Sequence, residues 1–340
     1  MATISWSRSE GVALMEQQDP RLQTIAVRIA AIHRETDEIR KFVLVHPDGD
    51  ALPAFAAGAH VDVHVAPGLI RQYSLVNPPS DAGRYVIAVK LEPQSRGGSA
   101  ALHRQPAVGD LVRISPPRSN FALDPAATHH LLLAGGIGIT PLLSMAGQLA
   151  EAGGSYTLAY FARAMELAGF AEELAGAAPA GRLSLHAGLN APATMAAVAA
   201  LLARQPKGTH VYVCGPRPFM DMVGELAAAC GPALPVHRED FAALPVQAHA
   251  GDGTIEVELA RSGSTVLVPP DRTIADVLIE RGVALETSCE QGICGTCLTR
   301  VLAGVPDHRD EFLLEDEQNA GELILPCVSR AKTARLVLDL

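Results

Sequence analysis

Residues 289–297 read CEQGICGTC, and a further cysteine, Cys327, follows thirty residues later. The pattern is C-x4-C-x2-C…C, and its four thiols belong to Cys289, Cys294, Cys297 and Cys327. This is the plant-type ligand spacing of a [2Fe–2S] cluster, in which four thiolates hold two irons. Gly292 and Gly295 allow the backbone to fold closely around inorganic sulfur and to aim N–H groups at it.

Structural zinc is the alternative occupant of these cysteines. Zinc sites usually combine paired C-x2-C knuckles, often with histidine. Here one C-x2-C stands alone, the extra cysteine precedes it by five residues, and the loop contains no histidine. The pattern therefore favours iron–sulfur. Because such a cluster moves one electron at a time, the rest of the chain should show where electrons enter and leave.

Length and composition indicate a globular protein of two or three domains, since the chain has 340 residues and 48% of them are hydrophobic. No apolar run approaches the roughly 20 residues of a membrane span. The first twenty residues carry charges and lack the apolar core of a signal peptide. Six cysteines, four of them assigned as ligands, do not form a disulfide framework. We expect a cytoplasmic protein with no membrane association.

Charge is unevenly distributed along the chain. Residues 249–340 hold 16 acidic and 8 basic side chains, a net of −8, whereas the preceding 248 residues hold 21 and 19. The total of −10 disfavours nucleic acid as a partner. The acidic segment is consistent with simple solvation, and equally with the steering of a basic partner protein toward a redox centre.

Residues 22–120 are expected to be β-rich. Short β-branched or alternating runs are separated by Pro, Gly and Asp turn signals, which predicts a barrel or sandwich with one short helix after Gly98. The expected strands are Leu22–Ile32, Ile39–His46, His60–His64, Gln72–Asn77, Tyr85–Lys90 and Leu111–Ser115.

Two stretches of this region fit a flat, phosphorylated cofactor. Arg71-Gln72-Tyr73-Ser74 offers a ring and polar groups at its edge. Arg96-Gly97-Gly98-Ser99, at a helix start, offers a cation, a hydroxyl and backbone N–H groups to an anion. Taken singly, the first is an ordinary edge strand and the second a surface turn. Together, ahead of the next domain, they predict a flavin phosphate site.

Residues 129–235 change to an alternating α/β pattern. A buried-strand run, His130–Leu133, leads into AGGIGITP at residues 134–141, and a helical stretch follows at Leu142–Ala152. Strand, glycine turn and helix form the nucleotide-binding βα geometry, and Pro141 suits the first turn of the helix. Pro141 also stands where a full G-x-G-x-x-G would have its third glycine, so the motif alone is weak evidence.

The rest of this segment predicts a doubly wound parallel sheet, because strands alternate with helices. The expected strands are Thr157–Phe161, Leu183–Ala187 and His210–Val213, with helices near 165–175, 194–204 and 217–229. The last strand ends at Cys214-Gly215-Pro216, at the carboxyl end where such sheets bind ligands.

The C-terminal segment begins after an Ala-rich linker. A hairpin is expected at Thr254–Leu259 and Thr265–Val268, followed by the helix Ile274–Arg281, which either Asp271 or Thr273 caps. The cysteine loop then leads to strands expected at Thr299–Ala303 and Ala334–Leu338.

In combination these motifs resemble the phthalate dioxygenase reductase family, which includes vanillate demethylase reductases. The resemblance runs from about residue 22 to residue 340, and Glu239-Asp240-Phe241 and Pro306-Asp307-His308-Arg309-Asp310 add to it. It implies a flavin-binding antiparallel β-barrel (21–124), a doubly wound NAD-binding α/β domain (125–241) and a C-terminal β-grasp-like [2Fe–2S] ferredoxin domain (254–340). Composition adds a flexible N-terminal tail (1–20) and the linker (242–253).

The resemblance also implies roles for individual residues. The FMN site would comprise Arg71, Gln72, Tyr73, Ser74, Val89, Lys90, Arg96, Gly97, Gly98 and Ser99. The NAD site would comprise Gly135, Gly136, Gly138, Thr140, Pro141, Arg163, Cys214, Gly215, Pro216, Asp240 and Phe241. The positions expected to act at the reacting atoms are Ser74, Cys214 and Phe241.

The implied reaction starts with a hydride from NADH, which carries two electrons, whereas the cluster accepts one. FMN must lie between them because it takes two electrons and returns them singly. The expected partner is a Rieske-type oxygenase, met transiently by a monomeric reductase, that hydroxylates or demethylates an aromatic or amine substrate. NADH is favoured over NADPH because only Arg163 stands where a 2′-phosphate would need more than one cation.

Two further readings bound this hypothesis. The chain could be a ferredoxin on an inert scaffold, but the motifs Gly135–Pro141 and Cys214–Pro216 argue against a carrier alone. It is not expected to be the oxygenase, since it has no C-x-H…C-x-x-H pair and no His/His/carboxylate set that reads as an oxygen-activating iron site. His129-His130 are not expected to bind metal, because no matching ligands stand nearby in the sequence.

Overall fold

A computed structural model describes residues 22–66, 68–93, 97–171, 173–174, 181–230, 234–241, 249 and 251–340. These residues belong to two compact units, each described by itself below. One unit is made of Thr24–Val63 and Tyr73–Asp240, and the other includes His64–Gln72 and Phe241–Leu340. The tail expected at 1–20 and most of the linker expected at 242–253 lie outside the described residues.

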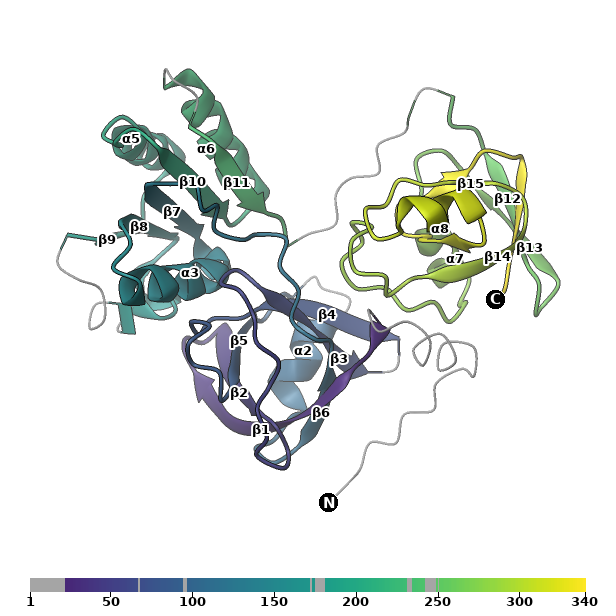
Figure 1. Ribbon diagram of the computed structural model, residues 1–340, viewed down its shortest axis with the longest axis horizontal. Helices are drawn as coiled ribbons and strands as arrows, with labels where there is room; N and C mark the ends of the chain where they lie inside the picture. Colours follow the sequence, from purple (N-terminus) through teal and green to yellow (C-terminus); the bar gives the residue numbers. More distant parts are fainter. Residues whose placement is uncertain are drawn as a thin grey trace. The chain divides into compact units, whose positions relative to one another are not determined.

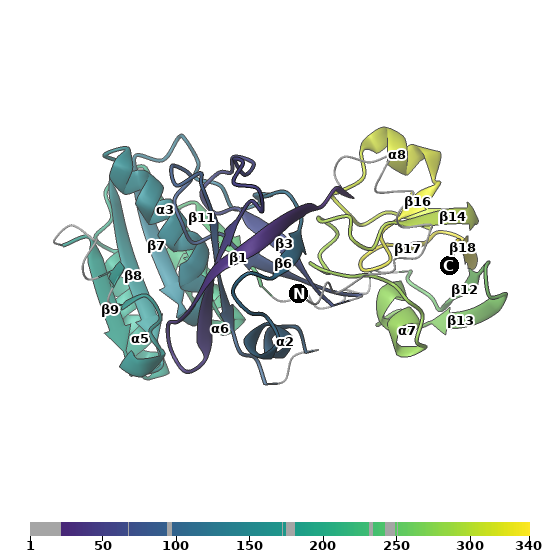
Figure 2. The same cartoon turned by 90° about the horizontal axis from the view of Figure 1, so that it is seen from below.

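Six antiparallel strands form the β-rich part of the chain, in the order β4-β3-β6-β1-β2-β5. The sheet closes into a barrel because Leu75, just beyond β4, forms a bridge with Ile87 of β5. Figure 2 shows β1 as the long strand that crosses the barrel. The strands are β1 (Ile25–Arg34), β2 (Ile39–Val45), β3 (His60–Ala66), β4 (Leu69–Ser74), β5 (Tyr85–Lys90) and β6 (Leu111–Ile114).

One barrel strand lies earlier than the sequence predicts. The strand expected at Gln72–Asn77 is β4, which begins at Leu69 directly after a turn at Gly68, where φ is +69°. Asn77 is not a strand residue, because its side chain holds the connection to β5. Its amide donates to the carbonyls of Asp81 and Arg84, and its oxygen accepts from the N–H of Val86 at 2.9 Å.

The short helix expected after Gly98 is α2 (Gly98–Arg104). It starts there because Gly97 adopts the left-handed conformation, with φ of +91°, which turns the chain into the helix. The ring of His103 contacts the carbonyl of Val89 at 2.8 Å and so fixes α2 against β5.

Five parallel strands form the second sheet, in the order β11-β10-β7-β8-β9. In Figure 1 the sheet runs between α3 on one face and α5 and α6 on the other. This is the doubly wound arrangement that the alternating pattern predicts. The strands are β7 (His129–Gly135), β8 (Tyr156–Ala162), β9 (Leu183–Ala187), β10 (Thr209–Cys214) and β11 (Val236–Glu239), and the helices are α3 (Ile139–Glu151), α5 (Ala191–Leu202) and α6 (Arg217–Ala229).

Two details of this sheet differ from the prediction. The strand that ends at Cys214 is not the last, because β11 pairs beside it in parallel with the register Cys214↔Glu239. The helix expected near 165–175 is divided in the described part of that stretch: a 3-10 turn at Met165–Leu167 is followed by Phe170, which takes a positive φ of 64°, and Ala171, Glu173 and Leu174 are helical again. A bulky residue in that conformation interrupts a regular helix.

The barrel and the α3 face of the parallel sheet share one hydrophobic core. Val76 and Val86 of the barrel pack in the same buried cluster as Leu142 and Met145 of α3. The opposite face of the sheet has its own core with α5 and α6, which includes Val198 and Val223. The shared core explains why these two parts form one compact unit.

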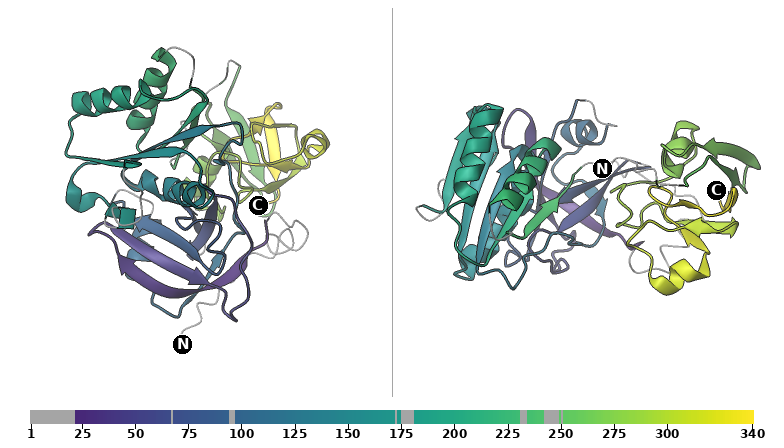
Figure 3. Two further views of the ribbon diagram at one scale, coloured as in Figure 1. Left: turned by 60° about the vertical axis from the view of Figure 1, so that its left-hand side comes forward. Right: turned by 90° about the horizontal axis from the view of Figure 1, so that it is seen from above.

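The second unit contains a mixed sheet in the order β13-β12-β18-β14-β16 and a small β15-β17 pair. Figures 2 and 3 show α7 and α8 on opposite sides of its strands. The elements are β12 (Ile255–Leu259), β13 (Ser264–Val268), α7 (Ile274–Glu280), β14 (Thr299–Ala303), β15 (Pro306–Asp307), α8 (Glu315–Ala320), β16 (Leu323–Ile324), β17 (Arg330–Ala331) and β18 (Arg335–Leu338).

The cap of α7 resolves one open alternative. Thr273, not Asp271, precedes the helix, and its hydroxyl accepts from the N–H of Asp276 at 2.9 Å. The packed helix and the mixed sheet give the β-grasp-like fold that the family resemblance implies. Among the helices of the described residues, none has the length and apolar character needed to cross a bilayer.

Candidate functional site

The four cysteines of the C-x4-C-x2-C…C pattern are brought together in the second unit. All four side chains are buried, with relative exposures of 7% or less. Cys289 and Cys294 form one hydrogen-bonded thiol pair, and Cys297 and Cys327 form another. Four buried thiols from one loop and one distant residue are the donor set that a [2Fe–2S] cluster requires.

Hydrogen bonds shift the thiol pKa values of Cys289 and Cys297 in opposite directions. A hydrogen bond from Cys294, with N–H groups of Gln291 and Ile293, lowers the pKa of Cys289 to about 7. The thiol of Cys297 donates to Cys327 and is buried, and both effects raise its pKa well above the usual range. The N–H of Gln291 lies 3.3 Å from the Cys289 sulfur, which shows that the loop aims backbone donors at sulfur as its glycines predict.

The cluster loop requires glycine at two positions. Gly292 and Gly295 adopt φ of +75° and +76°. A Cβ on Gly295 would lie 2.3 Å from the ring of Phe312, and one on Gly292 would lie 3.0 Å from the backbone of Asp310. The segment that follows β15 therefore packs directly onto the loop.

Ion pairs hold that segment in place. Arg309 donates to Asp252 at 3.0 Å and to Asp307 at 2.9 Å. Asp310, buried, accepts from the N–H of Leu313 at 2.9 Å and from the hydroxyl of Ser329 at 3.1 Å. The motif Pro306–Asp310, which the sequence singles out by resemblance, thus supports the back of the cysteine loop.

The residues expected to bind FMN follow three elements. Arg71, Gln72, Tyr73 and Ser74 lie on β4, Val89 and Lys90 end β5, and Gly97, Gly98 and Ser99 form the start of α2. Lys90 pairs with Glu92 at 2.6 Å, and the hydroxyl of Ser99 accepts from the N–H of Glu92 at 3.1 Å. Arg96 lies outside the described residues.

One buried polar atom in this set fits an absent ligand. The amide nitrogen of Gln72 is buried and has no hydrogen-bond partner among the described residues. A buried donor without a partner is costly, so a bound acceptor at this position would stabilise the protein. The carbonyl edge of a flavin ring has the chemistry to accept from it, and the residues present therefore fit FMN.

The two glycine motifs of the parallel sheet meet at the carboxyl ends of β7 and β10. A Cβ on Gly138 would lie 2.2 Å from the carbonyl oxygen of Cys214, and one on Gly215 would lie 2.9 Å from the Cα of Gly135. No side chain fits at these contacts. Gly136 bends the chain with φ of +55°, and the hydroxyl of Thr140 donates to the carbonyl of Ile137 at 3.0 Å. Bare backbone at a helix N-terminus is the geometry that receives a dinucleotide.

Three polar side chains converge where the barrel meets this edge of the sheet. Glu239, at the end of β11, accepts from the Ser74 hydroxyl at 3.5 Å through one carboxylate oxygen. Its other oxygen lies 3.6 Å from Nδ1 of His60, a buried ring. Cys214 stands beside Glu239 in the parallel register. Glu239 therefore brings together Ser74, which its carboxylate contacts, and Cys214, which is its partner in the strand register.

The surroundings keep the Cys214 thiol neutral. Burial raises its pKa well above the usual range, and the negative charges of Glu239 and Asp240 raise it further. A neutral, fully buried thiol is a poor nucleophile, so any role of Cys214 at the reacting atoms would be one of packing and positioning.

The remaining expected positions range from buried to exposed. Asp240 is paired with Arg238 at 3.0 Å and with Arg217 at 3.5 Å, so its carboxylate is engaged by arginines. Phe241 is 48% exposed, and Arg163 directly follows β8. Pro141 is buried in the first turn of α3, and Pro216 precedes α6.

Sequence reasoning missed two residues of this constellation. It assigned Asp240 and Phe241 to the site but gave no role to Glu239, and it included His60 only as the start of a strand. The sequence offers little signal for either residue, because β11 reads VHRE and β3 reads HVDVHVA, so that neither one stands out among apolar neighbours. Neither position identifies its partner until the tertiary fold brings β3, β4 and β11 together.

Comparison with known proteins agrees with this geometry. A vanillate O-demethylase oxidoreductase of Pseudomonas putida is 49% identical over 308 residues, which cover 90% of this chain and 96% of that protein. The chain belongs to this family of oxygenase reductases. The reductase is also 45% identical to a phenoxybenzoate dioxygenase subunit beta of Ectopseudomonas oleovorans, over 93% of this chain and 97% of that one.

A solved structure and two family descriptions match as well. The structure described as a phthalate dioxygenase reductase, modular for electron transfer from pyridine nucleotides to [2Fe–2S], is 39% identical to the reductase. It covers 93% of this chain and 98% of its own, with a TM-score of 0.68. Residues 257–332 match the 2Fe-2S iron-sulfur cluster binding domain, and residues 111–233 match the N-terminal domain of dimethylamine monooxygenase subunit DmmA-like proteins.

Family membership confirms the main expectations from sequence. The reductase is an electron-transfer oxidoreductase with the expected multidomain fold and the cofactor set of FMN, pyridine nucleotide and a [2Fe–2S] cluster. The matched cluster domain decides the iron–sulfur alternative over zinc. Its relatives are named as parts of oxygenase systems, so an oxygenase is its partner.

Proposed function

We propose that the chain is the NADH-dependent reductase of a Rieske-type oxygenase. It moves a hydride from NADH to FMN, then passes single electrons through the [2Fe–2S] cluster to an oxygenase that hydroxylates or demethylates an aromatic or amine substrate. The observation that carries the proposal is the convergence of Ser74, Glu239 and Cys214 beside two glycine motifs, on a chain that also gathers four buried cysteines.

FMN, held by the residues of β4, β5 and α2, would supply the conversion between a two-electron hydride and single electrons. The protein's own residues bind and orient. Ser74 donates toward Glu239 and so fixes its hydroxyl at the end of β4. Gly138 and Gly215 let the turns after β7 and β10 approach each other closely, so that their backbone can face a dinucleotide, and the neutral Cys214 thiol is fully buried beside them.

NADH rather than NADPH is the proposed donor. Arg163 is the single cation immediately after β8, where the ribose of a dinucleotide is bound in such sheets. Glu166, two residues beyond Ala164, adds a negative charge that opposes a 2′-phosphate. Because NADH is an intracellular reductant, we place the activity in the cytoplasm, with a monomeric reductase that meets the oxygenase transiently.

Purification and turnover test this function. The chain should carry one FMN and two irons and should reduce cytochrome c with NADH far faster than with NADPH. The proposal would be wrong if the purified chain contained no flavin or did not oxidise NADH. Turnover with the cognate oxygenase, measured over a panel of methoxylated aromatics, aromatic acids and quaternary amines, then assigns the substrate, which the reductase itself never touches.

A further inference from the structure

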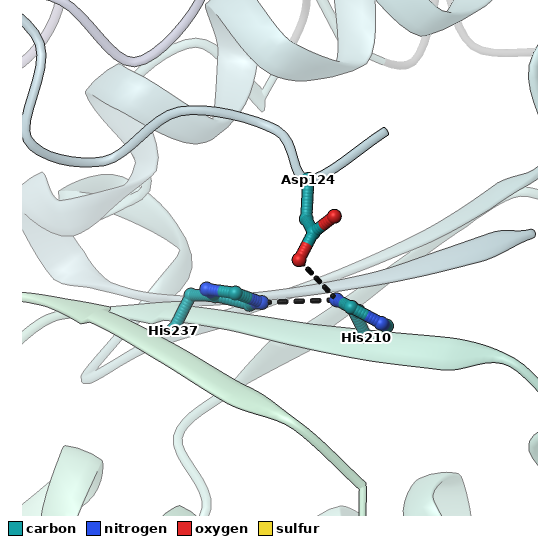
Figure 4. Close-up of side chains that lie close together, drawn as sticks. All are labelled: Asp124, His210 and His237. Carbon is teal, nitrogen blue, oxygen red and sulfur yellow. Dashed lines mark hydrogen bonds and ion pairs between the residues drawn. The ribbon is translucent and has the colours of Figure 1, made fainter. Parts of the chain in front are cut away.

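A cluster of metal-binding side chains lies outside the nucleotide site, on the barrel-side face of the parallel sheet. Asp124, His210 and His237 each offer one ligand atom, and the three atoms lie within 4.8 Å of one another (Figure 4). They come from three separate segments: the connection between β6 and β7, strand β10, and edge strand β11.

The distances within this cluster suit a small divalent ion. Nδ1 of His210 lies 3.0 Å from Nε2 of His237 and 3.6 Å from a carboxylate oxygen of Asp124. A tetrahedral ion with nitrogen and oxygen ligands at about 2.0–2.2 Å separates its donors by about 3.3–3.5 Å. The observed separations bracket that value.

The two imidazole nitrogens cannot both be bare. The rings are nearly coplanar, at 16°, with centroids 5.2 Å apart, so that they meet edge to edge through the two nitrogens. Two lone pairs facing each other at 3.0 Å repel, and a shared proton or a cation must relieve them. A bound ion replaces the proton, with each ring turning so that its lone pair points at the ion.

Neighbouring groups hold the three ligands in position. His237 stacks on the ring of Tyr212, with centroids 4.6 Å apart and planes at 12°. The hydroxyl of Tyr212 accepts from the N–H of Asp124 at 2.7 Å. One carboxylate oxygen of Asp124 accepts from the N–H of Ala126 at 2.8 Å, which leaves the other directed at His210. Ligands fixed by such outer contacts bind metal more tightly than mobile ones.

The cluster is separate from the nucleotide edge. His210 is the second residue of β10 and Cys214 the last, so four residues, or about 13 Å of strand, lie between them. An ion at His210 would therefore not touch a dinucleotide bound at Cys214.

We propose that Asp124, His210 and His237 bind a divalent transition metal ion of the zinc class, with water as the fourth ligand. Zn²⁺ binds both imidazole nitrogen and carboxylate oxygen, so it suits a set of two histidines and one aspartate. Ca²⁺ and Mg²⁺ prefer all-oxygen ligand sets and do not suit the two imidazoles. The ion ties the connection that carries Asp124 to edge strand β11, which has only one neighbouring strand. Its role is to lock the junction of barrel and sheet.

Zinc itself is the probe for the experiment. The holoprotein, with flavin and cluster in place, is dialysed free of loosely bound metal and titrated with Zn²⁺ by calorimetry. One zinc per chain is expected in addition to the cluster iron, and elemental analysis verifies both. X-ray absorption at the zinc edge should show nitrogen and oxygen ligands near 2.0–2.1 Å and no sulfur near 2.3 Å.

Two ligand variants and one control complete the design. His237→Gln and Asp124→Asn should each weaken zinc binding at least about tenfold. His46→Gln should leave zinc binding unchanged. His46 also faces a carboxylate, that of Asp50 at 3.8 Å, but it belongs to no group of three metal-binding side chains among the described residues. Asp124→Asn keeps the side-chain volume, and the absorption measurement needs no variant, so misfolding of one variant does not remove the test.

Three results would overturn the proposal. Sulfur in the zinc shell would place the ion on the cysteines. Equal affinity in the wild type and in both variants would show adventitious binding. If the wild type binds no stoichiometric zinc, a shared proton and not a metal ion explains the short distance between His210 and His237.

Discussion

The hydroxyl of Ser74 lies 3.5 Å from a carboxylate oxygen of Glu239, although 165 residues separate them in the chain. One ends a barrel strand and the other ends the edge strand of the parallel sheet. Glu239 also pairs with Cys214 in the strand register, and its carboxylate lies 3.6 Å from Nδ1 of His60. Since the flavin-binding and nucleotide-binding parts of the chain meet here, Glu239 is the residue whose replacement should most directly affect hydride transfer.

Glu239→Gln should lower the rate of flavin reduction by NADH at least about tenfold, because it removes the charged acceptor that orients Ser74. Stopped-flow absorbance of the flavin under anaerobic conditions measures that rate. Ser74→Ala should give a loss of similar size, and the double variant should lose little more than either single one, since both act through one contact.

A second serine–glutamate contact provides the control for that pair. Ser80 donates to Glu151 at 2.7 Å on an exposed surface of the same unit. Ser80→Ala and Glu151→Gln should leave flavin reduction within roughly a factor of two of the wild type. A Glu239→Gln variant as fast as these controls would remove Glu239 from the reaction.

Cys327→Ser should abolish the [2Fe–2S] cluster and spare the flavin site, because the cysteines and the nucleotide motifs belong to different units. Iron content should fall to background, and electron transfer to the oxygenase should stop. Reduction of ferricyanide by NADH, which draws electrons from the flavin, should continue. Cys230→Ser replaces a cysteine outside the ligand set and should change none of these readouts.

Gly295→Ala should reduce the iron content of the purified protein by at least half, because its Cβ would lie 2.3 Å from the Phe312 ring. Gly321→Ala is the matched control. Gly321 has a similar φ of +66°, but its Cβ would meet only Pro306, at 3.7 Å. Both variants carry the left-handed strain of about 1 kcal/mol. If both variants retain the same amount of iron, the contact between a Cβ at position 295 and the Phe312 ring does not limit cluster binding.

Tyr160→Phe should stabilise the first unit, and increasingly so at alkaline pH. The Tyr160 hydroxyl is buried and has no hydrogen-bond partner among the described residues, and burial raises its pKa to about 12. The wild-type fold thus holds a proton that the unfolded chain releases above about pH 10. Wild-type stability should fall between pH 10 and 12, and the variant should lack this component of the decline.

Urea unfolding of both proteins at pH 7, 10 and 12 measures the effect of Tyr160→Phe. At pH 7 the variant should be at least as stable as the wild type, because an unsatisfied buried hydroxyl is lost. Its advantage should widen between pH 10 and 12. Parallel curves for the two proteins across that range would contradict the assignment.

Electron transfer to the oxygenase should depend on salt. Residues 249–340 carry a net charge of −8, and Glu315, Asp316 and Glu317 open α8 shortly after the segment that packs on the cluster loop. Raising ionic strength from about 0.1 M to about 1 M shortens the Debye length from about 10 Å to about 3 Å and should slow the reaction. The rate of reduction of the oxygenase measures it.

Charge reversal distinguishes docking from a general salt effect. Glu315→Lys with Asp316→Lys should weaken the salt dependence and raise the KM for oxygenase. Glu225→Lys, an exposed acid on α6 of the other unit, should not. A transfer rate that does not respond to salt would end the acidic docking hypothesis and leave solvation as the role of these charges.

Local patterns predicted much of the fold because their causes are local. Strand alternation, glycine turns and the 3.6-residue period lie within a few residues of one another, so α6 at Arg217–Ala229 and β14 at Thr299–Ala303 are where the sequence places them. The errors have local causes too. The Gly68 turn moved β4, Phe170 interrupted the expected helix, and the four-residue β11 was too short to show a period.

The sequence by itself pointed to the four cysteines and to the nucleotide motifs, because those patterns lie largely in contiguous stretches of the chain. The spacing of the cysteines along the chain indicates which thiols a single loop can present to a cluster. A glycine turn before a helix indicates where a phosphate can approach the backbone. Only the tertiary structure decided that Glu239 contacts Ser74 and pairs with Cys214 in the strand register, and that Asp124, His210 and His237 meet. Sheet order and strand register bring those residues together, and no single stretch of sequence encodes either.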